Sequence, residues 1–143
     1  MNRAGFTLLE LIIVIFLIML MTGLSSVFFA NTLPSGRFTA TARELAATIK
    51  QARHLAQLTG ERELISIDMD SRSYRIEGRT EKTLPPGISI RVIDPFAGDI
   101  IRGKYLMTFH QTGKTEGGTI VLWNKTRTTF IQTDPVAGAI IIK

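Results

Sequence analysis

An uninterrupted apolar run close to the N-terminus dominates the hydrophobic pattern of the chain. No side chain is polar over residues 11–21, and only small polar residues interrupt the run before residue 30. As a helix, about 20 such residues would rise roughly 30 Å, the thickness of the hydrocarbon core of a bilayer. Glu10 is the only charged residue from Ala4 to Gly36. An acid placed there is energetically unfavourable and usually functional.

Proline and helical periodicity shape the next segment. Pro34 has no backbone N–H to donate and crowds the carbonyl of Ala30, so the sequence predicts a kink or short break over residues 33–36. Over residues 37–59 apolar side chains recur at spacings of four and three, which predicts one buried face of an α-helix that ends at Gly60. This stripe consists of Phe38, Ala42, Leu45, Ile49, Ala52 and Ala56. The polar residues off the stripe, which should face solvent, are Arg43, Glu44, Lys50 and Gln51.

After Gly60 an alternation of apolar and polar residues replaces the helical period, which predicts β-strands. Two pairs of runs are close enough for hairpins, residues 64–68 with 73–77 and residues 119–123 with 128–132. The remaining predicted strands are residues 88–93, 105–110 and 139–142, with loops over residues 94–99 and 111–118. One long helix followed by a run of antiparallel strands indicates an α+β fold.

Composition limits the class of protein. The chain has 143 residues, 45% of them hydrophobic, and it has no cysteine, which excludes a disulfide scaffold and thiol chemistry. About 110 residues follow the apolar segment, enough for one domain with a core of its own. The formal net charge is +5, but the excess is spread along the chain without a run of like charges. Such a diffuse excess offers little support for nucleic-acid binding.

Patterns typical of catalytic or metal sites are weak. His54 and His110 have no third ligand at a suitable spacing, so we interpret both as structural or surface residues. Asp68 and Asp70 lack the further oxygen ligands and the fixed glycine of a calcium loop. Lys114 lies in a glycine-rich connection, interpreted as a flexible loop, that lacks the Gly-Lys-Ser/Thr phosphate cradle. We therefore predict no catalytic residue, no cofactor and no metal, and a protein that is not an enzyme.

The segment Gly5-Phe6-Thr7-Leu8-Leu9-Glu10, followed by the apolar run, resembles the N-terminal signature of type IV pilins and of the pseudopilins of type II secretion. The resemblance implies that a prepilin peptidase removes a leader of residues 1–5 by cutting between Gly5 and Phe6. It also implies that the peptidase methylates the new amine of Phe6. Glu10 would then pair with the N-terminal amine of a neighbouring subunit, and this pairing would set the register between packed helices.

The rest of the chain extends the resemblance to the minor subunits of this superfamily. Positions similar to the H-type minor pseudopilins and related minor type IV pilins are Leu45, Ala52, Arg53, Ala56, Gly60, Phe109, Gly113, Gly118, Ile120 and Gly138. Major pilins carry a proline in the membrane helix where this chain has Val27, which favours a minor subunit. The resemblance implies a pilin-like fold with a transmembrane and assembly helix at residues 6–32, the break at residues 33–36 and a periplasmic domain at residues 37–143.

The function implied by the resemblance is that of a structural subunit of the type II secretion pseudopilus. The expected partners are other pseudopilins, the prepilin peptidase and the inner membrane, with no nucleic acid and no small-molecule substrate. The N-terminus is expected in the cytoplasm and the folded domain in the periplasm, although the basic residues flanking the helix specify this orientation weakly. Two alternatives stay open: a minor type IV pilin involved in pilus assembly or DNA uptake, and a signal-anchored periplasmic enzyme.

Overall fold

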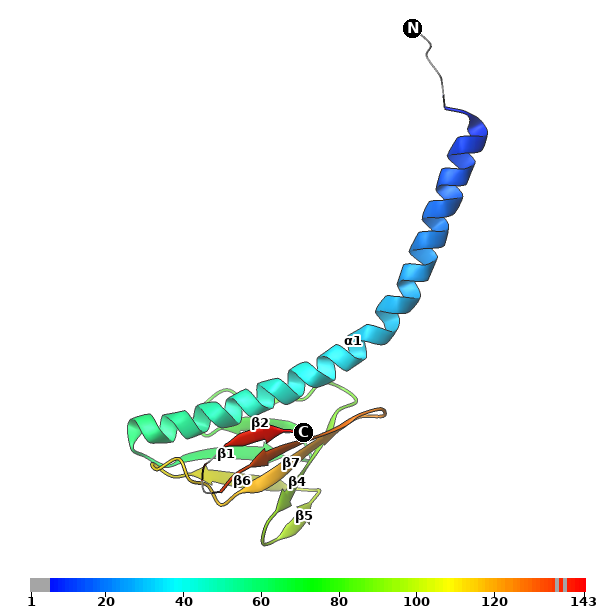
Figure 1. The fold of residues 1–143 in the computed structure, drawn as a ribbon. Coiled ribbons are helices and arrows are strands. Elements are labelled where there is room, and N and C mark those ends of the chain that lie inside the picture. Colours follow the sequence, from blue (N-terminus) through cyan, green and yellow to red (C-terminus); the bar gives the residue numbers. More distant parts are fainter. Residues whose placement is uncertain (1–5, 136, 138) are drawn as a thin grey trace. The chain divides into compact units, whose positions relative to one another are not determined.

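The computed structural model describes residues 6–135, 137 and 139–143, and for residues 24–35 it describes the backbone but not the side chains. Within these residues the chain forms one helix, α1 (Leu8–Thr59), followed by nine β-strands (Figure 1). Two compact units divide the chain, Met1–Arg37 and Phe38–Lys143. The order of elements, one long helix and then strands, is the predicted α+β arrangement.

The helix α1 is continuous over 52 residues. Its backbone stays helical through residues 33–36, so the structure has no break there, and the alternative of a kink stays a prediction. Pro34 removes only one of the many backbone hydrogen bonds of so long a helix, and each formed turn favours the next. The boundary between the two compact units nevertheless falls directly after Arg37, at the edge of the predicted segment.

The first unit carries apolar side chains on every side of α1. All large apolar side chains from Phe6 to Met21 are exposed, by 43–76%. A helix that is apolar all round requires apolar surroundings, which lipid or neighbouring helices can provide. Among the residues that the structure describes, no helical stretch is both sufficiently long and sufficiently apolar to span a bilayer.

The second unit begins with the C-terminal part of α1, whose predicted stripe is buried. The stripe residues from Phe38 to Ala56 are at most 2% exposed, whereas the polar residues predicted to face solvent, Arg43, Glu44, Lys50 and Gln51, are exposed. The prediction of one buried helix face is therefore confirmed. Gly60 ends the helix with a φ of +71°, which favours glycine, and its N–H donates to the Ala56 carbonyl over 3.1 Å.

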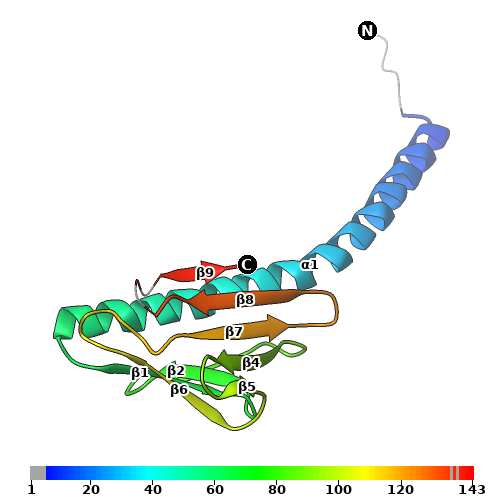
Figure 2. The same cartoon turned by 60° about the horizontal axis from the view of Figure 1, so that its bottom comes forward.

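Two antiparallel sheets pack against this part of α1 (Figure 1, Figure 2). The order of strands is β3-β2-β1-β6 in the four-stranded sheet and β5-β4-β7-β8-β9 in the five-stranded sheet. The bounds are β1 (Glu63–Asp68), β2 (Ser73–Ile76), β3 (Lys82–Thr83), β4 (Ser89–Asp94), β5 (Gly98–Ile100), β6 (Lys104–Phe109), β7 (Gly118–Trp123), β8 (Thr128–Thr133) and β9 (Ile140–Ile142).

Both predicted hairpins are present, because β1 pairs with β2 and β7 pairs with β8. The short strands β3 and β5 were not predicted, and β5 begins inside the segment that was interpreted as a loop. β1 also pairs with β6 along its whole length, from Glu63 opposite Phe109 to Asp68 opposite Lys104. This pairing of strands far apart in the sequence divides the β-structure into two sheets, where the sequence predicts a single sheet domain.

The core of the second unit lies between α1 and the inner faces of both sheets. Fully buried side chains come from the helix (Leu45 and Ile49), from the four-stranded sheet (Ile67) and from the five-stranded sheet (Leu122 and Ile131). Burial of each such side chain contributes about 1.5–3 kcal/mol to stability. The whole buried cluster belongs to residues 38–131, so the second unit has a core of its own.

Candidate functional site at the start of α1

The predicted processing site lies at the start of the first unit. Gly5 and the rest of the predicted leader lie outside the described residues. Phe6 is described: it precedes the helix, and its side chain is 76% exposed. Because α1 begins only at Leu8, a cut between Gly5 and Phe6 would not require the helix to unfold.

Thr7 caps the helix. The N–H of Glu10 donates to the Thr7 carbonyl over 3.1 Å and to the Thr7 side-chain Oγ1 over 3.3 Å. The first N–H groups of a helix have no partners within it, and a threonine at this position supplies them. Thr7 was not among the predicted site residues. Its signal is nevertheless present in the sequence, because a threonine followed three residues later by a glutamate and then an apolar run is the capping-box pattern.

Glu10 is the only charged residue among residues 6–23. Its side chain is exposed, and toward the described residues it makes no ion pair and no side-chain hydrogen bond. Attraction to the helix dipole stabilises a carboxylate in the first turn by about 0.3–1 kcal/mol. The carboxylate of Glu10 therefore has the helix dipole but no counter-ion among the described residues.

The two histidines do not form a site. His54 is exposed on α1, and His110 is half-buried directly after β6. In the described part of the chain, no group of three His, Cys, Asp or Glu side chains could hold a metal ion.

Asp68 and Asp70 stabilise turns. Asp68 Oδ1 accepts hydrogen bonds from the N–H groups of Asp70 and Ser71, both over 3.0 Å, in the β1–β2 turn. The Ser71 N–H above all holds the pKa of Asp68 below its ordinary value. Asp70 Oδ2 accepts the N–H of Gly103 over 3.1 Å. Both carboxylates therefore have a local structural role.

The glycine-rich connection around Lys114 begins with a hydrogen-bonded turn, where the sequence was interpreted as a flexible loop. The N–H of His110 donates to the Lys114 carbonyl over 2.9 Å, and the N–H of Gly113 donates to the His110 carbonyl over 2.7 Å. Gly113 has a φ of +78°, and a Cβ there would lie 2.5 Å from Nε2 of Gln57. These N–H groups bind carbonyls of the turn, so they do not form a phosphate cradle.

Arg53 has a long-range contact that the sequence does not reveal. Its Nη2 donates over 2.6 Å to the carbonyl of Ala137, in the connection between β8 and β9. This bond fastens the end of the chain to α1. Gly138, the last position in the resemblance to minor pseudopilins, lies outside the described residues.

Comparison with protein families supports the interpretation of the N-terminal segment. The profile described as "Prokaryotic N-terminal methylation motif" matches residues 1–26. The matched segment contains the predicted cleavage site, the predicted methylation site at Phe6, the cap at Thr7 and the carboxylate of Glu10. No curated protein sequence matches the chain.

Two solved structures of the minor pseudopilin EpsH, from the type II secretion system of Vibrio cholerae, resemble this protein. One has a TM-score of 0.59 and 13% sequence identity over 75% of this chain and 96% of that chain. The other has a TM-score of 0.61 and 11% identity over 75% of this chain and 93% of that chain. The chain therefore has the fold of a minor pseudopilin. The predicted pilin-like α+β fold is confirmed, with few side chains in common.

Proposed function

We propose that this chain is a minor pseudopilin, a structural subunit of a type II secretion pseudopilus that assembles through its N-terminal helix. One combination carries the proposal: a prokaryotic methylation motif at residues 1–26 and the fold of a minor pseudopilin occur in the same chain. Each feature alone fits a wider class of proteins, and together they fit a filament subunit.

In this proposal, prepilin peptidase removes residues 1–5 and methylates the amine of Phe6. Residues 6–32 are inserted in the inner membrane, with the N-terminus in the cytoplasm and the domain from residue 37 onward in the periplasm. The exposed apolar side chains of the first unit support this placement, because water would leave all of them unfavourably hydrated. In the assembled filament they would pack against the helices of other pseudopilins.

Glu10 is proposed to pair with the N-terminal amine of a neighbouring subunit. The cut at Phe6 creates that amine, and the Glu10 carboxylate has no cation among the described residues. In an apolar setting each of the two charges needs the other, since an unpaired buried charge costs several kcal/mol. The ion pair would therefore favour the one register between neighbouring helices that brings the Glu10 carboxylate to the amine of the next subunit.

The charge of Glu10 and the cap that Thr7 provides can be separated by two variants. Glu10→Gln removes the charge but keeps a side chain suited to a capping box, whereas Thr7→Ala removes the cap oxygen but keeps the charge. We expect both variants to be processed. We expect Glu10→Gln to cross-link to neighbouring subunits at least about tenfold less than the wild type, and Thr7→Ala to remain close to it. Cross-linking of Glu10→Gln at the wild-type level, or a loss in Thr7→Ala as large as in Glu10→Gln, would contradict the pairing.

Deletion of the gene in the source organism tests the proposed function. We expect reduced export of proteins across the outer membrane, with surface pili and DNA uptake unchanged, and recovery when the wild-type chain is returned. Loss of pili or of DNA uptake with normal export would instead identify a minor type IV pilin. An unchanged phenotype in all three measurements would contradict a role in either filament.

A further inference from the structure

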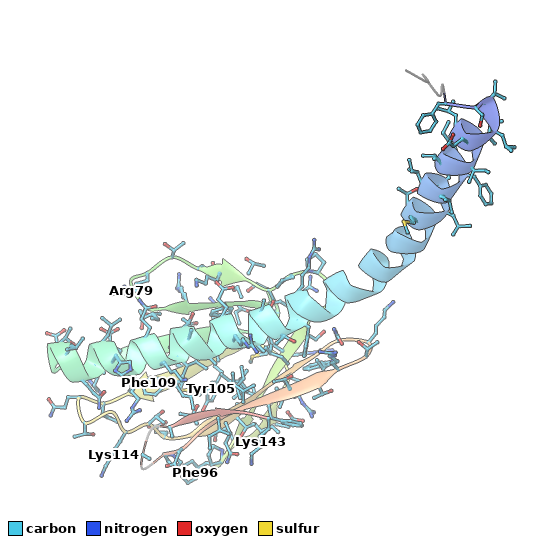
Figure 3. The ribbon with its side chains drawn as sticks, turned by 45° about the horizontal axis from the view of Figure 1, so that its top comes forward. Arg79, Phe96, Tyr105, Phe109, Lys114 and Lys143 are labelled. Atoms are coloured by element: carbon cyan, nitrogen blue, oxygen red, sulfur yellow. The ribbon has the colours of Figure 1, made fainter. Side chains whose placement is uncertain are left out.

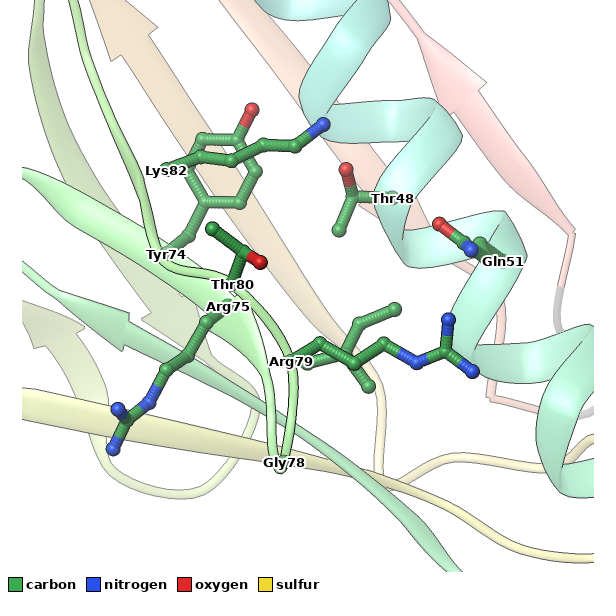
Figure 4. A pocket seen from close by; sticks show the side chains of 9 residues that line it. Thr48, Gln51, Tyr74, Arg75, Gly78, Arg79, Thr80 and Lys82 are labelled. Atoms are coloured by element: carbon green, nitrogen blue, oxygen red, sulfur yellow. The ribbon is translucent and has the colours of Figure 1, made fainter.

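A hollow of about 430 Å³ opens between α1 and the segment that joins β2 to β3 (Figure 4). The helix contributes Thr48 and Gln51 to its wall, β2 contributes Tyr74, and the joining segment contributes Arg79. All of these residues belong to the second unit, so the hollow is formed within one folded body.

The charged residues that line the hollow are all cations: Arg75, Arg79 and Lys82. Lys82 already has a carboxylate, because its Nζ lies 2.8 Å from Oε1 of Glu44 at the margin. Arg79 is exposed, and toward the described residues its guanidinium has no ion pair and no hydrogen bond. Figure 4 shows the Arg79 side chain extended toward Gln51, across the opening. The charge of Lys82 is therefore neutralised by Glu44, whereas the Arg79 guanidinium has no counter-ion among the described residues.

The floor of the hollow is fixed and uncharged. Tyr74 is 2% exposed and Ile76 is 3% exposed, so the floor belongs to the packed core. Burial, together with the negative charge of Glu44, raises the pKa of Tyr74 to about 12, so its hydroxyl stays neutral. The segment above is held by a turn in which the N–H of Arg79 donates to the Ile76 carbonyl over 3.0 Å. The floor and the backbone of the turn are therefore preformed, and the Arg79 side chain is the main part that binding would have to order.

We propose that this hollow binds a carboxylate side chain from the folded domain of another filament subunit, with Arg79 as its main ligand. The inference rests on the proposed function for the source of the partner. A guanidinium donates two parallel hydrogen bonds to a carboxylate, and the Glu44–Lys82 pair shows that an acid is already stable at this margin. A nucleic-acid backbone would need a row of unpaired cations, whereas this hollow is a short concave site.

Nuclear magnetic resonance of the full-length chain in zwitterionic micelles tests the proposal. The probe is a short peptide with two glutamates, and its control is the same peptide with glutamines. We expect the glutamate peptide to shift the amide signals of residues 78–80 saturably and the glutamine peptide to leave them in place. Arg79→Gln should weaken this binding about fivefold, as expected for the loss of one charged contact near the surface. Lys125→Gln, which removes an exposed charge in the β7–β8 turn, should not weaken it.

Three results would overturn the proposal. The first is that both peptides shift the same signals equally. The second is that the glutamate peptide shifts the signals near every exposed lysine and arginine alike. The third is that Arg79→Gln binds the glutamate peptide as well as the wild type does. In a further arm, micelles with added anionic lipid replace the peptide. A shift of residues 78–80 by anionic lipid but not by the glutamate peptide would assign the hollow to a membrane surface and contradict the proposal. This test uses the purified chain and needs no filament. If the glutamate peptide does not bind but deletion of the gene reduces export, the carboxylate site is contradicted and the proposed function is not.

Discussion

Tyr105 and Asp94 join the two sheets. The hydroxyl of Tyr105, in β6 of the four-stranded sheet, donates over 2.7 Å to the carboxylate of Asp94, at the end of β4 in the five-stranded sheet. The same carboxylate accepts the N–H groups of Phe96 over 2.8 Å and of Ala97 over 2.7 Å. One side chain therefore holds the β4–β5 turn and fastens the sheets together. Phe96 in this turn is 90% exposed and lies at the outer margin of the unit (Figure 3).

Tyr105→Phe should lower the free energy of unfolding of the second unit by about 1–2 kcal/mol, because the ring remains but the hydrogen bond to an ionised acceptor is lost. Chemical denaturation followed by the fluorescence of Trp123, the single tryptophan of the chain, measures this change. Phe96→Ala is the control, and its exposed side chain should change stability by less than about 0.5 kcal/mol. A Tyr105→Phe variant as stable as the wild type would show that the bond does not join the sheets in solution.

Acid should weaken the same connection. The Ala97 N–H first, and then the Tyr105 hydroxyl, hold the pKa of Asp94 below its ordinary value of 3.8. The folded pKa is thus lower than the unfolded one, so the contribution of Asp94 is complete above the unfolded value and is lost as the pH falls through the folded value. Denaturation between about pH 6 and pH 2 should show the wild type approaching Asp94→Asn in stability at the acid end. A constant difference across this range would contradict the lowered pKa.

The alanine-rich face of α1 should tolerate no larger side chain. Ala52 is fully buried against the sheets, whereas Ala47, five residues earlier on the same helix, is exposed. Ala52→Leu should lower the free energy of unfolding by about 1–3 kcal/mol through overpacking, and Ala47→Leu should have little effect. Helix propensity is nearly the same in both variants, so equal stabilities would mean that the sheets do not pack on α1 as described.

The sequence predicted what local periodicity determines. The buried stripe of α1 and both hairpins followed from spacing, since neighbouring residues alone decide which face of an element is apolar. The pairing of β1 with β6 did not follow, because strand partners far apart in the sequence leave no local pattern. The two-residue strand β3 is too short to show a period. Of the predicted kink or break near Pro34, the break does not occur, because one lost hydrogen bond does not end a helix with many turns on either side.

Some residues of the candidate sites can likewise be identified from the sequence, and others cannot. Glu10 was evident because a lone charge in an apolar run is conspicuous, and the cap at Thr7 could have been predicted from its spacing to Glu10. Arg79 could not be identified as a separate feature, because the sequence shows it only as one of many basic residues. Its place in the hollow depends on how the segment between β2 and β3 lies against Gln51 in the folded unit.

The proposed filament subunit must first be processed between Gly5 and Phe6. Mass spectrometry of the N-terminal peptide, from chain recovered in membranes of the source organism, tests it most directly. A strain without prepilin peptidase, in which the chain should stay at full length, is the control. We expect a peptide that begins at Phe6 with one methyl group on its amine. A peptide that begins at Met1, at Asn2 or at any residue other than Phe6, while other subunits of the same cells are processed, would contradict it.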